Sequence, residues 1–203
     1  MDIENHIHLA EIKLSELDPQ LGVLIGAQSP ITLRPQGGDF FSLCRSIIAQ
    51  QVSVASASAI FGRLEASTEL APAAVAGLTD EATRTIGLSR QKTAYIRDLA
   101  RHFLENPGIY THLNRNSDED VIAELTIIKG IGVWTAQMFL MFTLRRPDVF
   151  APDDIGLQRA MKQLYGWDSV PNTRVLAATA ERWRPYRTVA SLHLWASIEN
   201  APA

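Results

Sequence analysis

The segment from residue 125 to residue 154 reads LTIIKGIGVWTAQMFLMFTLRRPDVFAPDD. It begins as the apolar end of a predicted helix, is interrupted at Gly130 and Gly132, continues as a second helix and closes on Asp153 and Asp154. The two glycines allow a tight turn, and the start of the second helix presents backbone N–H groups and a positive dipole end. The segment therefore predicts two helices joined by a hairpin that is suited to holding a phosphate.

The composition is that of a globular protein. The 203 residues are 46% apolar with a net charge of −3, which is enough to build one domain or two small lobes around a cleft. Cys44 is the only cysteine, so these residues form neither a disulfide nor a four-cysteine zinc or iron–sulfur site. The N-terminus lacks the pattern of a signal peptide, and no run of about 18 apolar residues predicts a membrane span. We expect an intracellular protein.

The distribution of charge is more informative than the sum. An acidic total does not indicate a nucleic-acid partner, but basic side chains exceed acidic ones between residues 84 and 101. Most are arginines, whose guanidinium groups suit phosphate oxygens. The plainer interpretation, solvated helix faces, stays open for each of them.

Helix starts and stops recur along the chain, and sustained period-two alternation is nearly absent, which predicts an all-α fold. Thr79, Ser89, Ser117 and Asn172 are expected to cap helices. We expect one short extended piece, at residues 31–36. Beyond the hairpin, helices are predicted at residues 5–17, 40–53, 53–66, 80–87, 90–105, 155–166, 173–183 and 186–198. Asp18 and Pro19 are expected to end the first of these.

The motif IKGIGVWTAQ, the acid Asp154 and the tail ERWRPYRTVASLHLW together resemble the helix-hairpin-helix DNA glycosylases. Within that superfamily the chain is most similar to the DNA-3-methyladenine glycosylase II type, without the extra N-terminal β domain of some members. The likeness covers roughly residues 40–198, and Asp154 follows Gly132 by 22 residues, as the family motif requires. It implies a single glycosylase domain with the active site between two lobes, residues 1–45 plus 150–203 and residues 46–149. Lys129 stands before the first hairpin glycine, where many relatives have a proline.

Asp154 is the expected catalytic acid. A carboxylate in a poorly solvated cleft stabilises the oxocarbenium-like sugar left when an N-glycosidic bond breaks, and can activate water. Local sequence alone favours helix capping for both Asp153 and Asp154. The family spacing assigns catalysis to Asp154 and leaves capping to Asp153.

Trp134, Met138 and Trp195 occupy base-pocket positions by the resemblance. Indole faces attract positively charged alkylpurines and receive flipped-out bases, although tryptophan on an apolar helix face is more often part of the core. Met138 replaces a tyrosine found in some members, which affects the range of bases. Family enzymes that also cut the strand carry a lysine where this chain has Trp134, so the resemblance implies a monofunctional enzyme.

The resemblance also assigns DNA contacts. Gln51 occupies the wedge position that fills the duplex, with a helix-end amide bonded to backbone as the alternative. Gly130, Gly132 and Thr135 would offer backbone N–H groups to one phosphate. Ser89 and Lys92 are a second phosphate candidate, with an ordinary helix cap as the alternative. No cofactor and no iron–sulfur cluster are expected. In the family the hairpin carbonyls also hold a monovalent cation, and the corresponding carbonyls here would be those of Thr126, Ile128 and Ile131.

These observations predict a glycosylase that releases alkylated purines, 3-methyladenine and 7-methylguanine, from duplex DNA during base excision repair. Two alternatives are a glycosylase for neutral lesions such as hypoxanthine or ethenoadenine, and a non-catalytic module that binds damaged DNA. We expect a monomer that has no membrane partner, in the cytoplasm at the nucleoid, or in the nucleus of a eukaryote.

Overall fold

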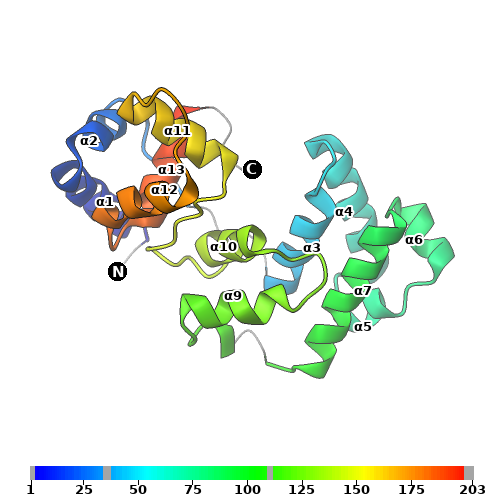
Figure 1. Cartoon of the computed structure of the whole chain (residues 1–203). Helices are drawn as coiled ribbons and strands as arrows, with labels where there is room; N and C mark the ends of the chain where they lie inside the picture. The colour runs from blue at the N-terminus through cyan, green and yellow to red at the C-terminus, as the bar shows by residue number, and fades with distance from the viewer. Residues whose placement is uncertain (1–2, 34–37, 109–111, 199–203) are drawn as a thin grey trace. The chain divides into compact units, whose positions relative to one another are not determined.

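The computed structural model describes residues 3–33, 38–108 and 112–198 (Figure 1), and no strand occurs in these ranges. The all-α prediction is therefore confirmed. The chain divides into two compact units, residues 1–34 with 145–203 (unit 1) and residues 35–144 (unit 2). The first expected boundary, at residue 45, was misplaced, since it would cut through helix α3 (Asp39–Ala49) of unit 2, and the second, at 150, lies close to the observed one at 145.

Unit 1 is built from both ends of the chain. Its helices are α1 (Ile3–Leu17), α2 (Pro19–Gly26), α11 (Ile155–Tyr165), α12 (Thr173–Ala180), the 3₁₀ turn η1 (Glu181–Trp183) and α13 (Arg187–Ser197). Helix α1 packs on α2 and α13, and α13 packs on α11. The core of unit 1 includes the buried side chains of Leu14, Leu21, Leu157, Met161, Trp183 and Leu194.

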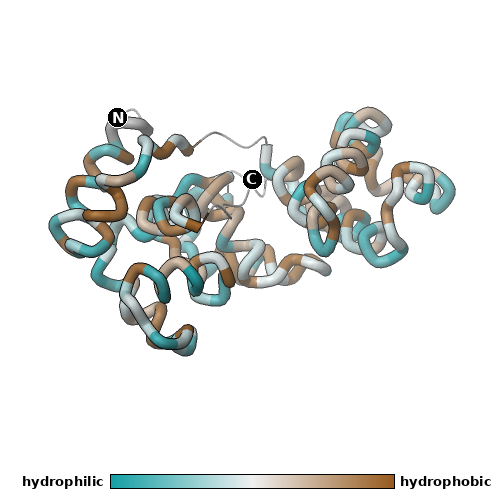
Figure 2. The backbone as a smooth tube through the Cα atoms, turned by 90° about the horizontal axis from the view of Figure 1, so that it is seen from above, coloured by the Kyte–Doolittle hydropathy of each residue, from teal (hydrophilic) through white to brown (hydrophobic). Residues whose placement is uncertain are grey.

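Unit 2 is continuous in sequence. Its helices are α3 (Asp39–Ala49), α4 (Val54–Thr68), α5 (Pro72–Ala76), α6 (Asp80–Ile86), α7 (Arg90–Glu105), α9 (Asp118–Thr126) and α10 (Val133–Phe142). Helix α7 packs against α3 and α5, and α9 packs against α10. In Figure 2 hydrophobic and hydrophilic stretches alternate along the helices, as expected when each turns one side to the core of its unit. No helix in the described ranges is long and apolar enough to cross a membrane.

Local signals placed most helix starts correctly. The side chains of Thr79, Ser89, Ser117 and Asn172 each accept a hydrogen bond from the backbone N–H three residues later, as predicted for N-caps. Residues 31–33 have no regular structure, and the rest of the expected extended piece lies outside the described residues. The helix expected to run through residue 53 ends at Ala49, so its final turn was wrong.

Helix α2 was missed because Asp18 and Pro19 were interpreted as the end of α1. Asp18 instead caps α2: its carboxylate accepts hydrogen bonds from the N–H of Leu21 (3.2 Å), the indole of Trp183 (3.0 Å) and the hydroxyl of Tyr165. Burial opposes ionisation of Asp18, but these three donors outweigh it and hold the pKa of the carboxyl below its ordinary value. Asp18 thus connects three elements of unit 1.

Candidate active site

The hairpin between α9 and α10 is fixed by contacts within unit 2. Gly130 has φ +86°, and a Cβ added there would lie 2.3 Å from Cδ2 of Tyr95, so the ring packs where only glycine fits. The carbonyl of Gly130 accepts a hydrogen bond from Nε2 of Gln50 (2.8 Å), and the N–H of Lys129 donates to Asp98 (2.9 Å). Helices α3 and α7 therefore hold the turn in one conformation.

The start of α10 carries the predicted phosphate and base contacts. Gly132 is the N-cap residue of α10, and it has no side chain that could accept a hydrogen bond from the backbone N–H groups of the first turn. The side chain of Trp134 is 41% exposed, whereas Met138, one turn later, is 7% exposed and Thr135 is buried. Of the three, Trp134 alone has a substantially exposed side chain.

A hollow of about 620 Å³ lies beside the hairpin and is formed entirely within unit 2. Several residues singled out from the sequence meet around it, namely Gln51, Ser89, Lys92, Gly130 and Gly132. These residues come from three separate stretches of chain. The fold therefore places the wedge candidate and both phosphate candidates around one depression.

Ser89 and Lys92 also have structural contacts. The hydroxyl of Ser89 accepts the N–H of Lys92 (3.2 Å) as the cap of α7, and Nζ of Lys92 donates to the carbonyl of Ile48 (2.6 Å). Partial burial lowers the pKa of the Lys92 ammonium. The capping alternative is confirmed for Ser89, and a phosphate contact by either residue remains a prediction.

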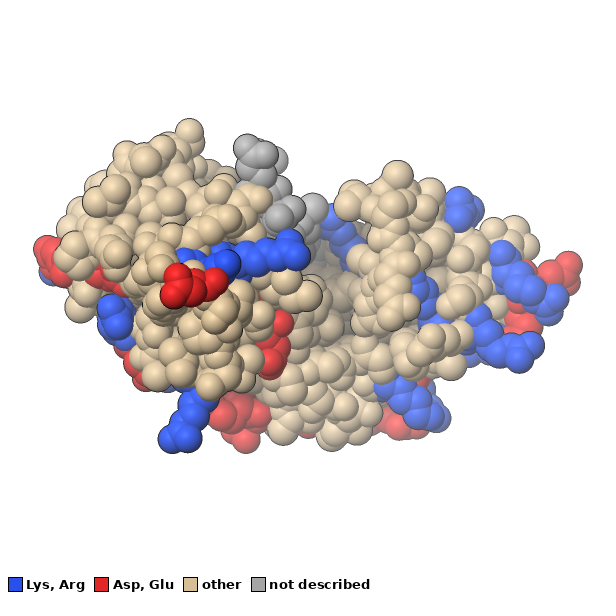
Figure 3. Space-filling view, turned by 45° about the horizontal axis from the view of Figure 1, so that its top comes forward, with Lys and Arg blue, Asp and Glu red and all other residues tan. Residues whose placement is uncertain are grey.

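Basic side chains gather over the helices of unit 2 on the face shown in Figure 3. Two arginines of the region 84–101 are held within the unit. Arg97 donates to the carbonyl of Leu78 (2.6 Å) and pairs with Asp80 (2.9 Å), and Arg101 pairs with Asp98. The alternative of helix faces in solvent therefore describes Arg97 and Arg101, and the structure adds an ion-pair partner for each.

Gln51 lies in the turn between α3 and α4. It has φ +57°, which is uncommon for a residue other than glycine, and its side chain is exposed. The alternative of an amide bonded to backbone describes its neighbour Gln50, which donates to Gly130. The geometry is thus compatible with a wedge role for Gln51.

Asp154 belongs to unit 1, at the start of α11. It is the N-cap residue, and its Oδ1 accepts hydrogen bonds from the N–H of Leu157 (2.8 Å) and from Nε1 of Trp195 (2.8 Å). The carboxylate is 9% exposed, whereas Asp153 is exposed. The assignment of capping to Asp153 was wrong, because the backbone geometry gives that role to Asp154 itself.

Trp195 is 1% exposed, so it does not offer the open indole face expected of a base platform. Its pocket role stays a prediction, while the structure shows that the polar edge of the indole is directed at the carboxylate of Asp154. Helix α13, which carries Trp195, is also tied to α1. The buried ring of His193 lies 2.7 Å from Oε1 of Gln28 and 3.1 Å from Oε1 of Glu11. Burial lowers the pKa of His193, and Glu11 opposes that shift.

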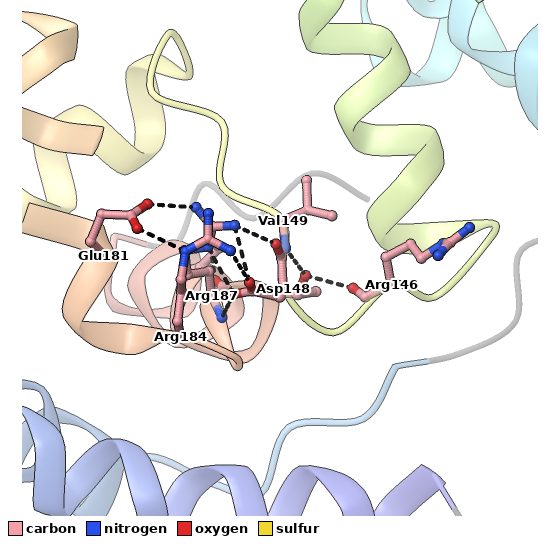
Figure 4. A network of polar contacts seen from close by, with 8 residues as sticks. Arg146, Asp148, Val149, Glu181, Arg184 and Arg187 are labelled. Atoms are coloured by element: carbon pink, nitrogen blue, oxygen red, sulfur yellow. Dashed lines mark hydrogen bonds and ion pairs between the residues drawn. The ribbon is translucent and has the colours of Figure 1, made fainter. Parts of the chain in front are cut away.

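The chain that leads into Asp154 is clamped to the start of α13 (Figure 4). Arg187 donates from Nε to Oδ1 of Asp148 (2.8 Å) and from Nη2 to its Oδ2 (3.1 Å), a two-pronged contact. Arg184 donates to the same carboxylate (2.7 Å), and Glu181 accepts from both arginines. The hydroxyl of Thr188 continues the clamp by accepting the N–H of residue 149 (3.0 Å).

The carbonyls proposed for a cation lie in the hairpin and just before it. The carbonyl of Ile128 accepts the N–H of Ile131 (3.1 Å) and keeps a second lone pair. Backbone carbonyls are suitable ligands for hard cations. No cluster of three or more His, Cys, Asp or Glu side chains suited to a metal occurs among the described residues.

Sequence reasoning missed three contributors, Tyr95, Gly156 and the pair of Asp148 with Arg187. A glycine at the start of an otherwise helical stretch signals a close approach, and Gly156 has that pattern. A Cβ at Gly156 would lie 3.0 Å from both Oδ1 of Asp154 and Cδ1 of Trp195. The other two contributors depend on long-range contacts and leave no local signal.

Residues 44–185 match the family model described as the HhH-GPD superfamily base excision DNA repair protein. The chain belongs to this superfamily. A crystal structure of DNA-3-methyladenine glycosidase from Bacillus halodurans superposes with a TM-score of 0.85 at 39% identity, covering 92% of this chain and 88% of that one. The Schizosaccharomyces pombe 3-methyladenine DNA glycosylase Mag1, in complex with abasic DNA, superposes with a TM-score of 0.78 at 30% identity, covering 95% and 97%.

The YfjP protein of Bacillus subtilis is 40% identical over 128 residues, which are 63% of this chain. The match spans 45% of that relative's length. The comparisons therefore show the superfamily and the fold of this chain, whereas its activity is a proposal.

Proposed function

We propose that this protein is a monofunctional DNA glycosylase that hydrolyses the N-glycosidic bond of alkylated purines, 3-methyladenine and 7-methylguanine, in duplex DNA. The observation that carries the proposal is Asp154. It is a nearly buried carboxylate held by two hydrogen bonds, 22 residues after the second hairpin glycine, in a chain of the HhH-GPD superfamily.

Asp154 supplies the chemistry. As the bond to the base breaks, positive charge develops on the sugar, and a fixed carboxylate stabilises that charge. The same group orients or deprotonates the attacking water. An alkylpurine already carries positive charge and leaves readily, so a strong general acid is not required.

Trp134 is the base-contacting residue of this proposal, and the support for it is exposure: Trp134 is 41% exposed, whereas Trp195 is buried. A desolvated cationic base on an indole face gains about 2 kcal/mol. The buried side chain of Met138, one turn further along α10, would limit the depth of the pocket.

The DNA contacts would come from unit 2. The start of α10 at Gly132 binds one phosphate through backbone N–H groups, with Gly130 allowing the close approach. Ser89 and Lys92 line the same hollow and would bind a neighbouring phosphate. The exposed side chain of Gln51 enters the duplex where the damaged base has left.

A monovalent cation on the carbonyls of Thr126, Ile128 and Ile131 would offset the charge of the bound phosphate. We also propose that the protein works as a monomer on chromosomal DNA, in the nucleoid or the nucleus.

The decisive experiment incubates the protein with methylated duplex DNA and identifies the released bases by chromatography. Release of 3-methyladenine or 7-methylguanine is the expected result, with unmethylated duplex as the control. Binding to methylated DNA without any release would instead identify a damage-binding module.

The enzyme is expected to leave an intact strand with an abasic site. Trp134 stands where a strand-cutting relative would need a nucleophilic amine, so no Schiff base forms with the sugar. Borohydride added during turnover should trap no covalent adduct, and alkali should be needed to cut the product strand. A borohydride-trapped complex of the wild-type protein would refute the monofunctional mechanism.

Replacing Trp134 with leucine should slow release of 7-methylguanine more than release of the neutral base hypoxanthine. Leucine keeps apolar bulk and removes the indole face, so the loss of about 1–2 kcal/mol applies to the cationic base, roughly a 5- to 30-fold effect. The measurement is the ratio of the two single-turnover rates.

Trp167→Leu is a matched control, since that tryptophan lies in unit 1 after the end of α11. Its ratio of rates should equal that of the wild-type protein. An equal slowing of both bases in Trp134→Leu would show that the indole contributes shape and not charge recognition.

A further inference from the structure

The carboxylate of Asp154 has both of its described hydrogen bonds on one oxygen. Leu157 donates its backbone N–H and Trp195 its indole N–H to Oδ1, each at 2.8 Å. The first bond comes from α11 and the second from α13, 41 residues away. Two donors from different helices fix the rotation of the carboxyl group, and therefore the direction of Oδ2.

Gly156 leaves the space that this arrangement needs. A Cβ at this position would lie 3.0 Å from Oδ1 of Asp154, 3.0 Å from Cδ1 of Trp195 and 3.2 Å from its Nε1. These distances are tighter than ordinary van der Waals contact. Any larger side chain at residue 156 would press on both partners of the hydrogen bond while leaving their chemical groups intact.

The same unit contains a second indole–carboxylate pair for comparison. Trp183 donates its indole N–H to Asp18 at 3.0 Å, and both residues are buried. That pair joins α2 to η1, and Asp18 has no part in the proposed chemistry. A hydrogen bond from tryptophan to a buried carboxylate can thus be purely structural, so the role of Trp195 requires a test that separates stability from rate.

We propose that Trp195 and Gly156 are positioning residues for Asp154: Trp195 aims the carboxylate, and Gly156 keeps the gap that lets the indole reach it. The inference rests on the proposed glycosylase function. Catalysis by a fixed charge depends on geometry, and a small misplacement of the reacting group can cost about 100-fold in rate. Trp195 then acts through Asp154 and not as a platform for the base.

The test measures single-turnover release of 7-methylguanine at saturating protein, together with the Kd for a duplex that contains an abasic site. Trp195→Phe keeps the aromatic bulk and removes the donor. We expect base release to slow about 10- to 100-fold, which is the change in rate that corresponds to losing one hydrogen bond to a charged group. The Kd for the abasic duplex should be nearly unchanged. Trp183→Phe is the matched control, expected to unfold at a lower temperature yet release base at the wild-type rate.

Gly156→Ala provides an independent variant should Trp195→Phe fold poorly. Helix propensity alone favours alanine in α11, so slower release without a loss of thermal stability would indicate pressure on the pair. Gly26→Ala, at the end of α2, is the control because a Cβ there meets nothing within 4 Å. It should release base at the wild-type rate.

The double variant Trp195→Phe/Gly156→Ala shows whether the two residues act together. Because both changes disturb one hydrogen bond, the combined slowing should be smaller than the product of the single effects. Multiplicative effects, or a wild-type rate in Trp195→Phe, would overturn the inference while the glycosylase function stands. Absence of base release by the wild-type protein would overturn the function and this inference with it.

Discussion

The Asp154→Asn variant is expected to release alkylated bases at least about 100-fold more slowly than the wild-type protein. The amide keeps the shape of the carboxylate, and asparagine is a good N-cap, so Leu157 retains its acceptor. What is lost is the negative charge that stabilises the developing cation on the sugar. The measurement is the single-turnover release of 3-methyladenine from methylated duplex DNA.

Asp153→Asn is the matched control, because the neighbouring carboxylate is exposed and is not the cap of α11. It should keep nearly the full rate. Both variants should unfold at the wild-type temperature. Asp154→Ala should lose about 2–4 kcal/mol of stability, because it removes the cap and also the acceptor of the buried indole N–H of Trp195. A dead Asp153→Asn variant beside an active Asp154→Asn variant would transfer the catalytic role to Asp153.

The hairpin and the helix caps could be predicted because their signals are local. Gly130 and Gly132 interrupt an apolar helical pattern, and Ser89 and Ser117 each precede a helix by one residue. Asp18 with Pro19 carried an equally local signal for the start of α2, since proline is favoured in the first turn. The same two residues are compatible with the end of one helix and the start of the next, and here they do both.

The environment of Asp154 could not be predicted from the sequence. Capping and catalysis were treated as alternatives for two adjacent acids, but the structure gives Asp154 the cap as well as a bond from Trp195. The partner indole lies on a helix 41 residues away, and nothing in the local pattern indicates which edge of the ring faces the carboxylate. A role that depends on how an indole ring is oriented can be assigned only from the three-dimensional structure.

Gln50 and Gln51 show the same limit at a helix end. The sequence placed both in the last turn of one helix, but α3 ends at Ala49 and the chain turns with φ +57° at Gln51. Gln50 then reaches the carbonyl of Gly130, 80 residues away. A long-range hydrogen bond thus decides which of two identical side chains supports the hairpin and which one is exposed.

Gly130→Ala is expected to lower the free energy of unfolding by about 2–5 kcal/mol. Alanine at φ +86° is strained by about 1–2 kcal/mol. The new Cβ would also lie 2.3 Å from the ring of Tyr95, and relieving such an overlap costs typically 1–3 kcal/mol more. Because Tyr95 and Gly130 line the same hollow, the displaced turn should also bind duplex DNA more weakly. The measurements are denaturant unfolding and Kd for an abasic duplex.

Gly132→Ala is the control, because it replaces a hairpin glycine without causing backbone strain or an overlap with a side chain. Gly132 has φ −95°, and a Cβ there meets nothing within 4 Å, so the change should cost only about 1 kcal/mol as a poorer helix cap. In a Tyr95→Ala background the overlap is absent, so adding Gly130→Ala should cost only the backbone strain, less than the same change costs in the wild-type protein. Equal destabilisation by Gly130→Ala and Gly132→Ala would mean that the contact with Tyr95 does not set the shape of the turn.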